Sequence, residues 1–269
     1  MDDRTGELQK ELEFQADRAA KIESVTPTPD YIFDRYRKSS LPWIFPKEML
    51  FRSLGQISGR EILDMGCGEG ELSTQLAKLG ARVVGIDISP ELIEVARRRA
   101  VADSVQERTE FLVWDILEKP LPEERFDLVT CSAVLHHVNI ESFLPVLWAS
   151  LKPGGIAVMI EPLGLSPGLR KLRAHVPVNT EASPGEHPLT RKELDLILQI
   201  LGDARVNYYE LFSRLQVFLP NRNKIDRGHW FTKAALVSLG SVDRFLLGML
   251  PFLRKFAGEA VIVGRKQPR

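Results

Sequence analysis

The sequence predicts an α/β fold in which a parallel β-sheet is covered by helices on both faces. Short apolar segments alternate along the chain with segments of helical periodicity, which is the order of elements typical of parallel sheets. The chain also has 269 residues, of which 44% are hydrophobic and 27% charged. A chain of this length and composition can bury the core of one large domain or of two small ones.

Five strands and their helices follow one another through the centre of the chain. The expected strands cover residues 61–65, 82–86, 110–113, 126–131 and 155–160. The expected helices between them cover residues 70–79, 89–102 and 140–151. The second of these helices begins with Ser89-Pro90, a capping residue followed by a proline at the first helical position.

The two ends of the chain are less regular. A helix is expected over residues 7–22, and prolines interrupt the aromatic-rich segment that follows it. We therefore expect residues 1–54 to form a helical cap or substrate segment and residues 55–269 to form the main domain. Near the C-terminus, a capping box at Thr190 begins a helix that runs to about residue 201, and two strands are expected over residues 204–212 and 258–264.

Two segments of the main domain lack the alternation. Prolines recur in residues 162–189, and a loop of this length is typically a lid or a binding loop. Residues 214–257 form an apolar helical insertion, and residues 229–256 fit helices packed on the core, a homodimer interface, or peripheral contact with a membrane or lipid. Basic side chains near both segments either bind an anionic group of a substrate or form a solvated face: Arg170, Lys171, Arg173, His175, Arg214, Arg222, Lys224 and Arg227.

Charge and cysteine content exclude several classes of protein. The 36 basic and 36 acidic residues balance, which argues against general binding of nucleic acid through its phosphates. Cys67 and Cys131 are too few for a disulfide scaffold and suit a reducing compartment. The sequence carries neither a secretory signal nor a long apolar run. We expect a cytoplasmic protein, with peripheral contact at the inner membrane face as an extension.

The most informative segment is residues 62–70, Ile-Leu-Asp-Met-Gly-Cys-Gly-Glu-Gly. It predicts a strand, then a turn with three alternate glycines, then a helix. Glycines are needed where the backbone adopts positive φ or lets a ligand approach closely. A dinucleotide-binding turn has G-x-G-x-x-G around a pyrophosphate, which Asp64 at the strand end would repel. The carboxylate instead favours a ligand that carries an ammonium group and a neighbouring cation.

Two further acids end the next two strands. Asp87 ends the second strand about 20 residues after Asp64, where an acid can accept both hydroxyls of a ribose. Asp115 follows the third strand, where it can bond an adenine amine while Ile88 and Ile116 sandwich the ring. Either acid alone is compatible with the start of an ordinary loop. Three acids at three consecutive strand ends favour a nucleoside site.

Residues 57–162 resemble the class I S-adenosylmethionine-dependent methyltransferases. Five stretches are similar to the motifs of that family in their order along the chain: residues 62–70, 83–89, 115, 126–137 and 151–155. The resemblance implies a Rossmann-like, doubly wound sheet of seven strands, mostly parallel with an antiparallel last strand. Within the family, the pattern looks like the small-molecule branch that includes ubiquinone and menaquinone methyltransferases (methyltransferase type 11).

The resemblance also implies a cofactor and its site. The cofactor is S-adenosylmethionine, and S-adenosylhomocysteine is its product. Asp64 and the glycines are assigned to the methionine end, Asp87 to the ribose and Asp115 to the adenine, while the end of the fourth strand passes beneath the sulfonium. The complete expected set is Asp64, Gly66, Cys67, Gly68, Gly70, Asp87, Ile88, Trp114, Asp115, Ile116, Cys131 and Ser132. Cys67 is expected to be a small packing residue of the turn.

Three residues beyond the strand ends are the candidates for catalysis. Methyl transfer from a sulfonium is an in-line displacement, so positioning supplies much of the acceleration, and a hydroxyl or amine acceptor has a proton to lose. Because imidazole titrates near neutrality, we expect His136 or His137 to take that proton, with Glu161 orienting the imidazole or the substrate. The alternative is that the Leu-His-His turn caps a helix or bonds the backbone.

The sequence therefore predicts a methyltransferase for a small, lipidic or anionic molecule. An oxygen acceptor is preferred over nitrogen or carbon because a histidine base is available. A metal site is not expected, because metal-dependent relatives place acids where this chain has Cys-Ser-Ala-Val at residues 131–134. There are two alternative interpretations. In the first, the acceptor is a ring carbon of a quinone-type molecule. In the second, the protein binds the cofactor without catalysis and acts through a partner. Neither the acceptor nor the choice between monomer and homodimer follows from the sequence.

Overall fold

A computed structural model describes residues 2–168, 187–213 and 230–268. Seven strands form one sheet in the order β3-β2-β1-β4-β5-β7-β6. Strands β1 to β5 pair in parallel, and β7 runs antiparallel to both β5 and β6, as expected from the sequence. The strands are β1 Glu61–Met65, β2 Arg82–Asp87, β3 Thr109–Val113, β4 Phe126–Ser132, β5 Leu151–Pro162, β6 Ala204–Tyr209 and β7 Glu259–Arg265.

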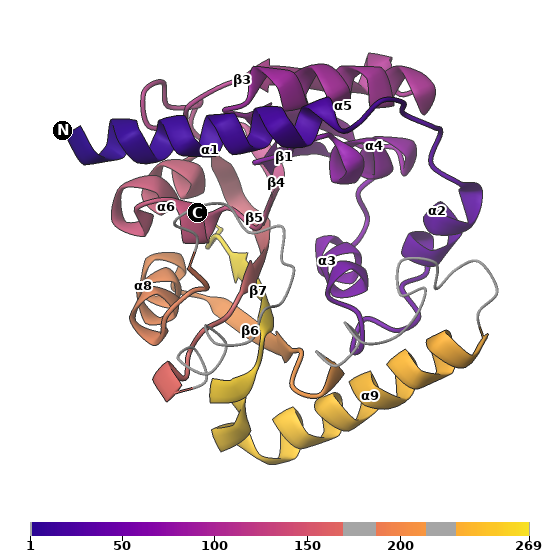
Figure 1. Ribbon diagram of the computed structural model, residues 1–269, viewed down its shortest axis with the longest axis vertical. Coiled ribbons are helices and arrows are strands. Elements are labelled where there is room, and N and C mark those ends of the chain that lie inside the picture. Colours follow the sequence, from indigo (N-terminus) through magenta and orange to yellow (C-terminus); the bar gives the residue numbers. More distant parts are fainter. Residues whose placement is uncertain (1, 169–186, 214–229, 269) are drawn as a thin grey trace.

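Helices cover both faces of the sheet (Figure 1). Along a strand, successive side chains point to opposite faces. Thus Ile62 packs in a core with α3, α4 and α5, whereas Leu63 packs in a second core with α6 and α8. The doubly wound arrangement is confirmed. The helices of these two layers are α3 Pro46–Leu54, α4 Glu71–Lys78 and α5 Pro90–Ala102 on one face, and α6 Ile140–Ala149 and α8 Arg191–Leu201 on the other.

The N-terminal segment contains two further helices, α1 Asp2–Ala20 and α2 Asp30–Arg37. Helix α1 packs along α5 at the top of the molecule in Figure 1. Pro46, which we expected to interrupt the chain, is the first residue of α3, where a missing N–H costs nothing. The role of residues 1–54 as a cap stays a prediction.

Helix α3 is fixed against the preceding linker by a buried carboxylate. Glu48 is 1% exposed, and it accepts hydrogen bonds from Leu41 N at 2.7 Å and from Arg35 Nε at 2.6 Å. A buried carboxylate is tolerated when donors satisfy it in this way. The clasp holds the first turn of α3 in one position.

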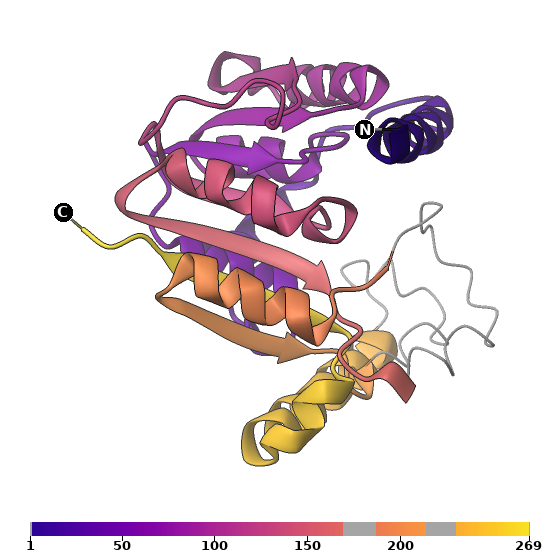
Figure 2. The same cartoon turned by 90° about the vertical axis from the view of Figure 1, so that its left-hand side faces the viewer.

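The C-terminal stretch is helical, as expected, and is divided in two. It consists of α9 Trp230–Met249 and a 3₁₀ helix, η5 Pro251–Phe256, because Pro251 ends the regular helix. Both lie beyond the β6 edge of the sheet (Figure 2). Two shorter 3₁₀ helices are η1 Gln106–Arg108 and η2 Leu135–His137. Within the described ranges, no helix has the length and apolar character needed to cross a bilayer.

The expected lid loop over residues 162–189 is described at its two ends. Leu163 and Leu189 form an isolated β-bridge, and Gly164 N donates to Leu189 O at 2.9 Å. Residues 169–186 and 214–229 lie outside the described residues. So do all eight basic side chains near these two segments that the sequence singled out, and their roles stay predictions.

Candidate active site

A cavity of about 1380 Å³ opens at the carboxyl ends of β1 to β4. The turns after these strands line it, together with residues of α1 and α3. Ligands of doubly wound sheets bind at this edge. Because pockets for one small molecule usually hold about 300–1,000 Å³, the cavity has room for two small molecules together.

The glycine turn after β1 forms one wall. Gly66, Gly68 and Gly70 have φ values of +67°, +52° and +77°, which side-chain-bearing residues rarely adopt. A Cβ on Gly66 would overlap Val134 Cγ2, whereas a Cβ on Gly68 would meet no atom within 4 Å. Gly66 therefore allows two segments of the chain to pack, and Gly68 leaves space that faces the cavity.

Asp64 lies at the end of β1 beneath this turn. It is 2% exposed, and its carboxylate accepts hydrogen bonds from Ser73 Oγ at 2.5 Å and from Thr130 Oγ1 at 2.8 Å. Thr130 can reach it because β1 and β4 pair with these two residues in register. Burial raises the pKa of Asp64 to about 6, against the hydrogen bonds from Ser73 and Thr130 and the charge of Lys47.

Asp87 connects the end of β2 to the glycine turn. Its Oδ2 accepts from Gly68 N at 2.8 Å and its Oδ1 from Ser89 N at 3.0 Å. Burial raises its pKa, although these N–H donors favour the charged form. Asp115 is held by Leu117 N, which donates to its Oδ1 at 2.8 Å. The two acids lie on the cavity wall together with Ile88, Trp114 and Ile116, as expected.

Two expected cofactor residues lie elsewhere. Gly70 is absent from the wall; a Cβ there would come within 2.7 Å of Ala96 Cβ, so this glycine serves helix packing. The Cys131 side chain is wholly buried in the core, and the next residue, Ser132, lies on the wall instead. Cys67 lies on the wall with a buried thiol whose pKa burial raises well above its usual range, which fits a packing residue.

Ser132 marks an incomplete hydrogen-bond network. Its hydroxyl oxygen is buried and has no partner in the described part of the chain. An unsatisfied buried hydroxyl is costly, and a polar group of a ligand in the cavity would satisfy it. Together with the open side of Gly68 and the three acids, this orphaned hydroxyl fits a polar nucleoside ligand.

The candidate bases His136 and His137 also lie on the wall of the cavity. His136 is 5% exposed, and its Nδ1 lies 2.7 Å from Glu161 Oε2. Glu161 is fully buried, and its Oε1 accepts from Val134 N and Leu135 N, both at 2.9 Å. A carboxylate can only accept, so the His136 proton lies on Nδ1 and Nε2 is the basic nitrogen. His137 Nδ1 lies farther from its acid, 3.8 Å from Glu11 Oε2 of α1.

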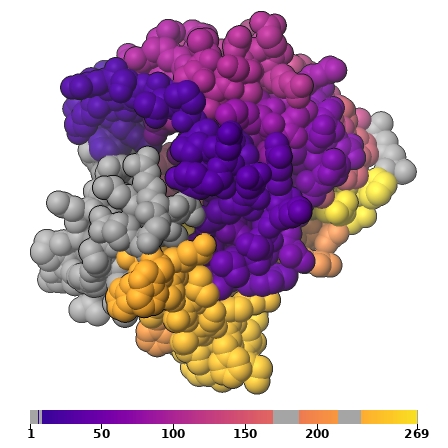
Figure 3. All heavy atoms as spheres, turned by 90° about the vertical axis from the view of Figure 1, so that its right-hand side faces the viewer, coloured from indigo at the N-terminus to yellow at the C-terminus, as the bar shows by residue number. Residues whose placement is uncertain are grey.

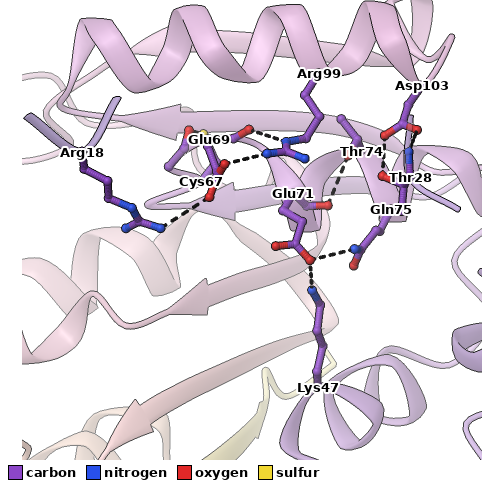
Figure 4. A network of polar contacts seen from close by, with 11 residues as sticks. Arg18, Thr28, Lys47, Cys67, Glu69, Glu71, Thr74, Gln75, Arg99 and Asp103 are labelled. Carbon is purple, nitrogen blue, oxygen red and sulfur yellow. Dashed lines mark hydrogen bonds and ion pairs between the residues drawn. The ribbon is translucent and has the colours of Figure 1, made fainter. Parts of the chain in front are cut away.

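Residues 1–54 were expected to form a cap or substrate segment, but the sequence did not single out Arg18 of α1 and Lys47 of α3. Arg18 and Lys47 reach from these helices to the acids of the glycine turn (Figure 4). Arg18 Nη2 lies 3.5 Å from Glu69 Oε1, and Lys47 Nζ lies 2.7 Å from Glu71 Oε1. Arg99 of α5 also binds Glu69, at 2.6 Å. No sequence pattern marks these cations, because their position depends on how the N-terminal helices pack.

Comparison with known proteins identifies the central part of the chain. Residues 63–159 match a family described as "Methyltransferase domain". This stretch of the chain is therefore similar to a methyltransferase domain. The chain is 43% identical over 112 residues to "Ubiquinone biosynthesis O-methyltransferase, mitochondrial" of Schizosaccharomyces pombe, covering 41% of this chain and 40% of that protein. It is 36% identical over 113 residues to "Demethylmenaquinone methyltransferase" of Tropheryma whipplei, covering 41% and 45%.

Solved structures share the fold of this chain over a longer stretch. "[4+2]-Cyclase SpnF" covers 83% of this chain and 81% of its own, with a TM-score of 0.56 and 19% identity. A phosphoethanolamine N-methyltransferase 2 of Haemonchus contortus, in complex with phosphomonomethylethanolamine and S-adenosylhomocysteine, covers 82% and 51%, with a TM-score of 0.54 and 19% identity. The chain spans less than half the length of the two curated relatives above. The described residues of the cavity fit S-adenosylmethionine, the cofactor that the resemblance implies.

Proposed function

We propose that the protein transfers a methyl group from S-adenosylmethionine to a hydroxyl oxygen of a small molecule. The observation that carries this proposal is the His136–Glu161 pair on the wall of the cavity, with 2.7 Å between Nδ1 and Oε2. A neutral imidazole held in one tautomer is suited to remove the proton of a hydroxyl. Because Glu161 fixes the ring, His136 is the preferred base over His137.

The residues of the chain divide the work between binding and proton transfer. When bound, S-adenosylmethionine supplies a methyl group activated by its sulfonium. Asp64 faces the ammonium of the methionine portion, Asp87 the ribose and Asp115 the adenine. His136 holds the acceptor oxygen and takes its proton, and Glu161 stabilises the imidazolium that results. Positioning of donor and acceptor in line supplies much of the remaining acceleration.

The relatives support two acceptor classes. Their names include a ubiquinone-pathway O-methyltransferase and a demethylmenaquinone methyltransferase. A quinol headgroup offers both a hydroxyl oxygen and a ring carbon, so quinone-type carbon methylation is the second candidate. The fold alone does not choose, because it also occurs in a [4+2]-cyclase.

The test is a transfer assay with isotopically labelled S-adenosylmethionine, a cell extract and a panel of catechols and short-chain quinols. Mass spectrometry then locates the label in any product. We expect label on an oxygen of one acceptor class. Label on a ring carbon would select the second candidate. Binding of the donor without transfer to any acceptor would favour a cofactor-binding protein that acts through a partner.

The titration of Asp64 predicts how donor binding depends on pH. The ammonium of the donor favours the ionised carboxylate, whose pKa is about 6 in the folded protein, against 3.8 for an unperturbed aspartate. Affinity should therefore rise as pH increases toward about 6 and level off above it, with a slope of up to about tenfold per pH unit below that point. Calorimetry from pH 5 to 8 measures this.

Asp64→Asn serves as the control for this titration. The variant should bind more weakly at pH 8 and show a flat profile. The pH dependence of folding stability has the opposite sign. Because the pKa of Asp64 rises from 3.8 to about 6 on folding, protonated Asp64 stabilises the folded state fully at pH below about 3.8. This stabilisation is lost as the pH rises through about 6. An equally steep binding profile in Asp64→Asn would assign the dependence to another group.

We also propose that the surface of α9 and η5 contacts an anionic membrane. One side of α9 is buried at helical spacing, through Thr232, Leu236, Gly240, Asp243 and Leu247. Its other side and η5 expose large apolar side chains suited to the headgroup region of a bilayer: Trp230, Phe231, Val242, Phe245, Met249, Leu250 and Phe252. In the described part of the chain, these seven side chains are more than the isolated apolar residues that are normal on a protein surface.

The charges of this surface favour an anionic partner. Lys233, Arg244 and Lys255 are exposed there. Asp243, the one acid in residues 230–256, is 3% exposed and accepts hydrogen bonds from the backbone of residues 211–213. Basic side chains near an anionic bilayer each contribute about 1 kcal/mol. Figure 3 shows α9 on the same face as α1 and the α2–α3 segment, both of which contribute to the cavity wall.

Vesicle co-sedimentation tests this contact. The protein should pellet with phosphatidylcholine vesicles that contain phosphatidylglycerol, and less with phosphatidylcholine alone. The triple variant Phe245→Gln, Met249→Gln, Phe252→Gln should stay in the supernatant. The matched control, Val101→Gln with Val113→Gln, changes exposed apolar residues elsewhere and should pellet normally. A triple variant that pellets like the wild type, or a wild-type dimer that the variant dissociates, would contradict membrane contact.

A further inference from the structure

The order of the strands places the assigned groups in one line along the edge of the sheet. Asp115, Asp87 and Asp64 lie at the ends of β3, β2 and β1, the first three strands of the order β3-β2-β1-β4-β5-β7-β6. The His136–Glu161 pair comes next, because it joins the turn after β4 to the end of β5. The assigned donor lies on one side of this pair, so the body of the acceptor lies on the other, over β5 and the next strand, β7.

Glu259 is the first residue of β7 and lies on the cavity wall on this side of the base. Because β7 runs antiparallel to β5, its start lies beside the end of β5, where Glu259 pairs with Pro162, the residue after Glu161 (Figure 1). Neighbouring strands lie about 4.8 Å apart, so two spacings, about 10 Å in all, separate β4 from β7. This separation suits one aromatic ring with a substituent opposite the reacting hydroxyl.

The Glu259 side chain points to the face of the sheet that α3 covers. Alternate side chains of a strand share a face, and Val261, two positions further on, packs in the core with α3. Ile160 of β5 packs against the same core and also lines the cavity. Tyr209 is the cross-strand partner of Glu259 in β6. Burial raises the pKa of the Tyr209 phenol, the charge of Arg244 lowers it, and the nearby charge of Glu259 raises it further.

The permanent cations of the described wall bind other acids. Arg18 Nη2 lies 3.5 Å from Glu69 Oε1 of the glycine turn. Lys47 Nζ lies 2.7 Å from Glu71 Oε1, just after that turn. His187 also lines the wall, and it is charged only when protonated. Among the described residues, the acceptor side of the wall thus offers a carboxylate and no permanent cation, and a negative substituent there would lose water to meet a like charge.

We propose that Glu259 selects an acceptor whose substituent remote from the reacting hydroxyl is an uncharged or cationic hydrogen-bond donor, and discriminates against a carboxylate or phosphate at that position. The proposal deepens the proposed function and rests on it. Glu259 is then a specificity residue, and the proton transfer remains with His136 and Glu161. Of the acceptors that the sequence left open, this assignment favours the uncharged, lipidic class over the anionic one.

Three probes that share one ring and differ in one substituent test the assignment. They are 3,4-dihydroxybenzyl alcohol, 3,4-dihydroxybenzylamine and 3,4-dihydroxybenzoate, which are uncharged, cationic and anionic near neutral pH. Calorimetry on protein saturated with S-adenosylhomocysteine measures their binding without turnover. Wild-type protein should bind the alcohol and the amine at least about tenfold more tightly than the benzoate, the effect of one like-charge contact that water partly screens.

Charge variants of Glu259 test whether this side chain causes the preference. In Glu259→Gln the benzoate should gain about tenfold and the amine should lose affinity, so that the preference disappears. Glu259→Lys should reverse it. The matched control is Glu110→Gln, which removes an exposed acid of β3 away from the wall and should keep the wild-type order. Denaturant unfolding shows whether each variant is folded.

Three results would overturn the assignment. Wild-type protein could bind the benzoate as tightly as the alcohol, the preference could persist in Glu259→Gln, or the alcohol and the amine could both fail to bind. A different result separates this assignment from the proposed function. If the probes bind in the expected order and none gains a methyl group from S-adenosylmethionine, the proposed function fails while the role of Glu259 stands.

Discussion

Replacing His136 with asparagine should lower the kcat of methyl transfer by about 10²–10⁴-fold, the usual contribution of a general base. Affinity for S-adenosylmethionine should stay close to wild type, because the groups assigned to the donor are the glycine turn and the acids at the ends of β1, β2 and β3. Asparagine keeps an N–H donor for Glu161, which would otherwise lose its bond from Nδ1 while fully buried. Initial rates with labelled donor, measured beside calorimetry, check both parts.

His137→Asn is the matched control, because it changes the same side chain one position further on. The acid near His137 Nδ1 is Glu11, at 3.8 Å, and not the buried Glu161 that orients His136, so we expect little change in kcat. Glu161→Gln should lower kcat and shift the pH profile of kcat, because the imidazolium loses its counter-charge. If His136→Asn keeps full turnover, the His136–Glu161 pair has only a structural role. The reason to prefer an oxygen acceptor is then removed.

Gly66→Ala should lower the free energy of unfolding by about 2–5 kcal/mol, the sum expected for left-handed backbone and overpacking. Its φ is +67°, and the added Cβ would overlap the Val134 side chain. Val134 directly precedes the 3₁₀ helix η2 that carries His136, so the clash should also disturb the site. Denaturant unfolding measures the stability, and calorimetry measures the loss of donor binding.

Gly59→Ala separates the cost of left-handed backbone from the cost of overpacking against Val134. Gly59 has a φ of +76°, but a Cβ there would meet no atom within 4 Å. Its replacement should cost about 1–2 kcal/mol, the backbone term alone, and leave donor binding unchanged. Equal losses of stability in the two variants would mean that Val134 moves aside at no cost.

The strands and their acids were predictable because their signals are local. A buried parallel strand is a short apolar run, and the carboxyl ends of such strands meet at one edge of the sheet. This is why Asp64, Asp87 and Asp115 could be expected to lie together, and they line one cavity. Glu161 could be expected near the two histidines because β4 and β5 are adjacent and parallel, but the sequence did not show that it pairs with His136.

Other features depend on packing that the sequence does not display. Cys131 and Ser132 differ by one position in an apolar run, and only the register of β4 decides which side chain reaches the cavity. The fifth strand was expected over residues 155–160, yet β5 begins at Leu151, because a register shift lets Leu151 pair with Phe126. Lys47 and Arg18 belong to helices whose position depends on contacts between residues that are far apart in the sequence.

The β-bridge between Leu163 and Leu189 gives this architecture a modular property. The bridge holds Leu163 and Leu189 side by side, so the length of chain between them can change without a change of strand register. The groups assigned to the methyl donor lie elsewhere, at the ends of β1 to β4. Insertions or deletions between the two leucines should therefore leave donor binding intact.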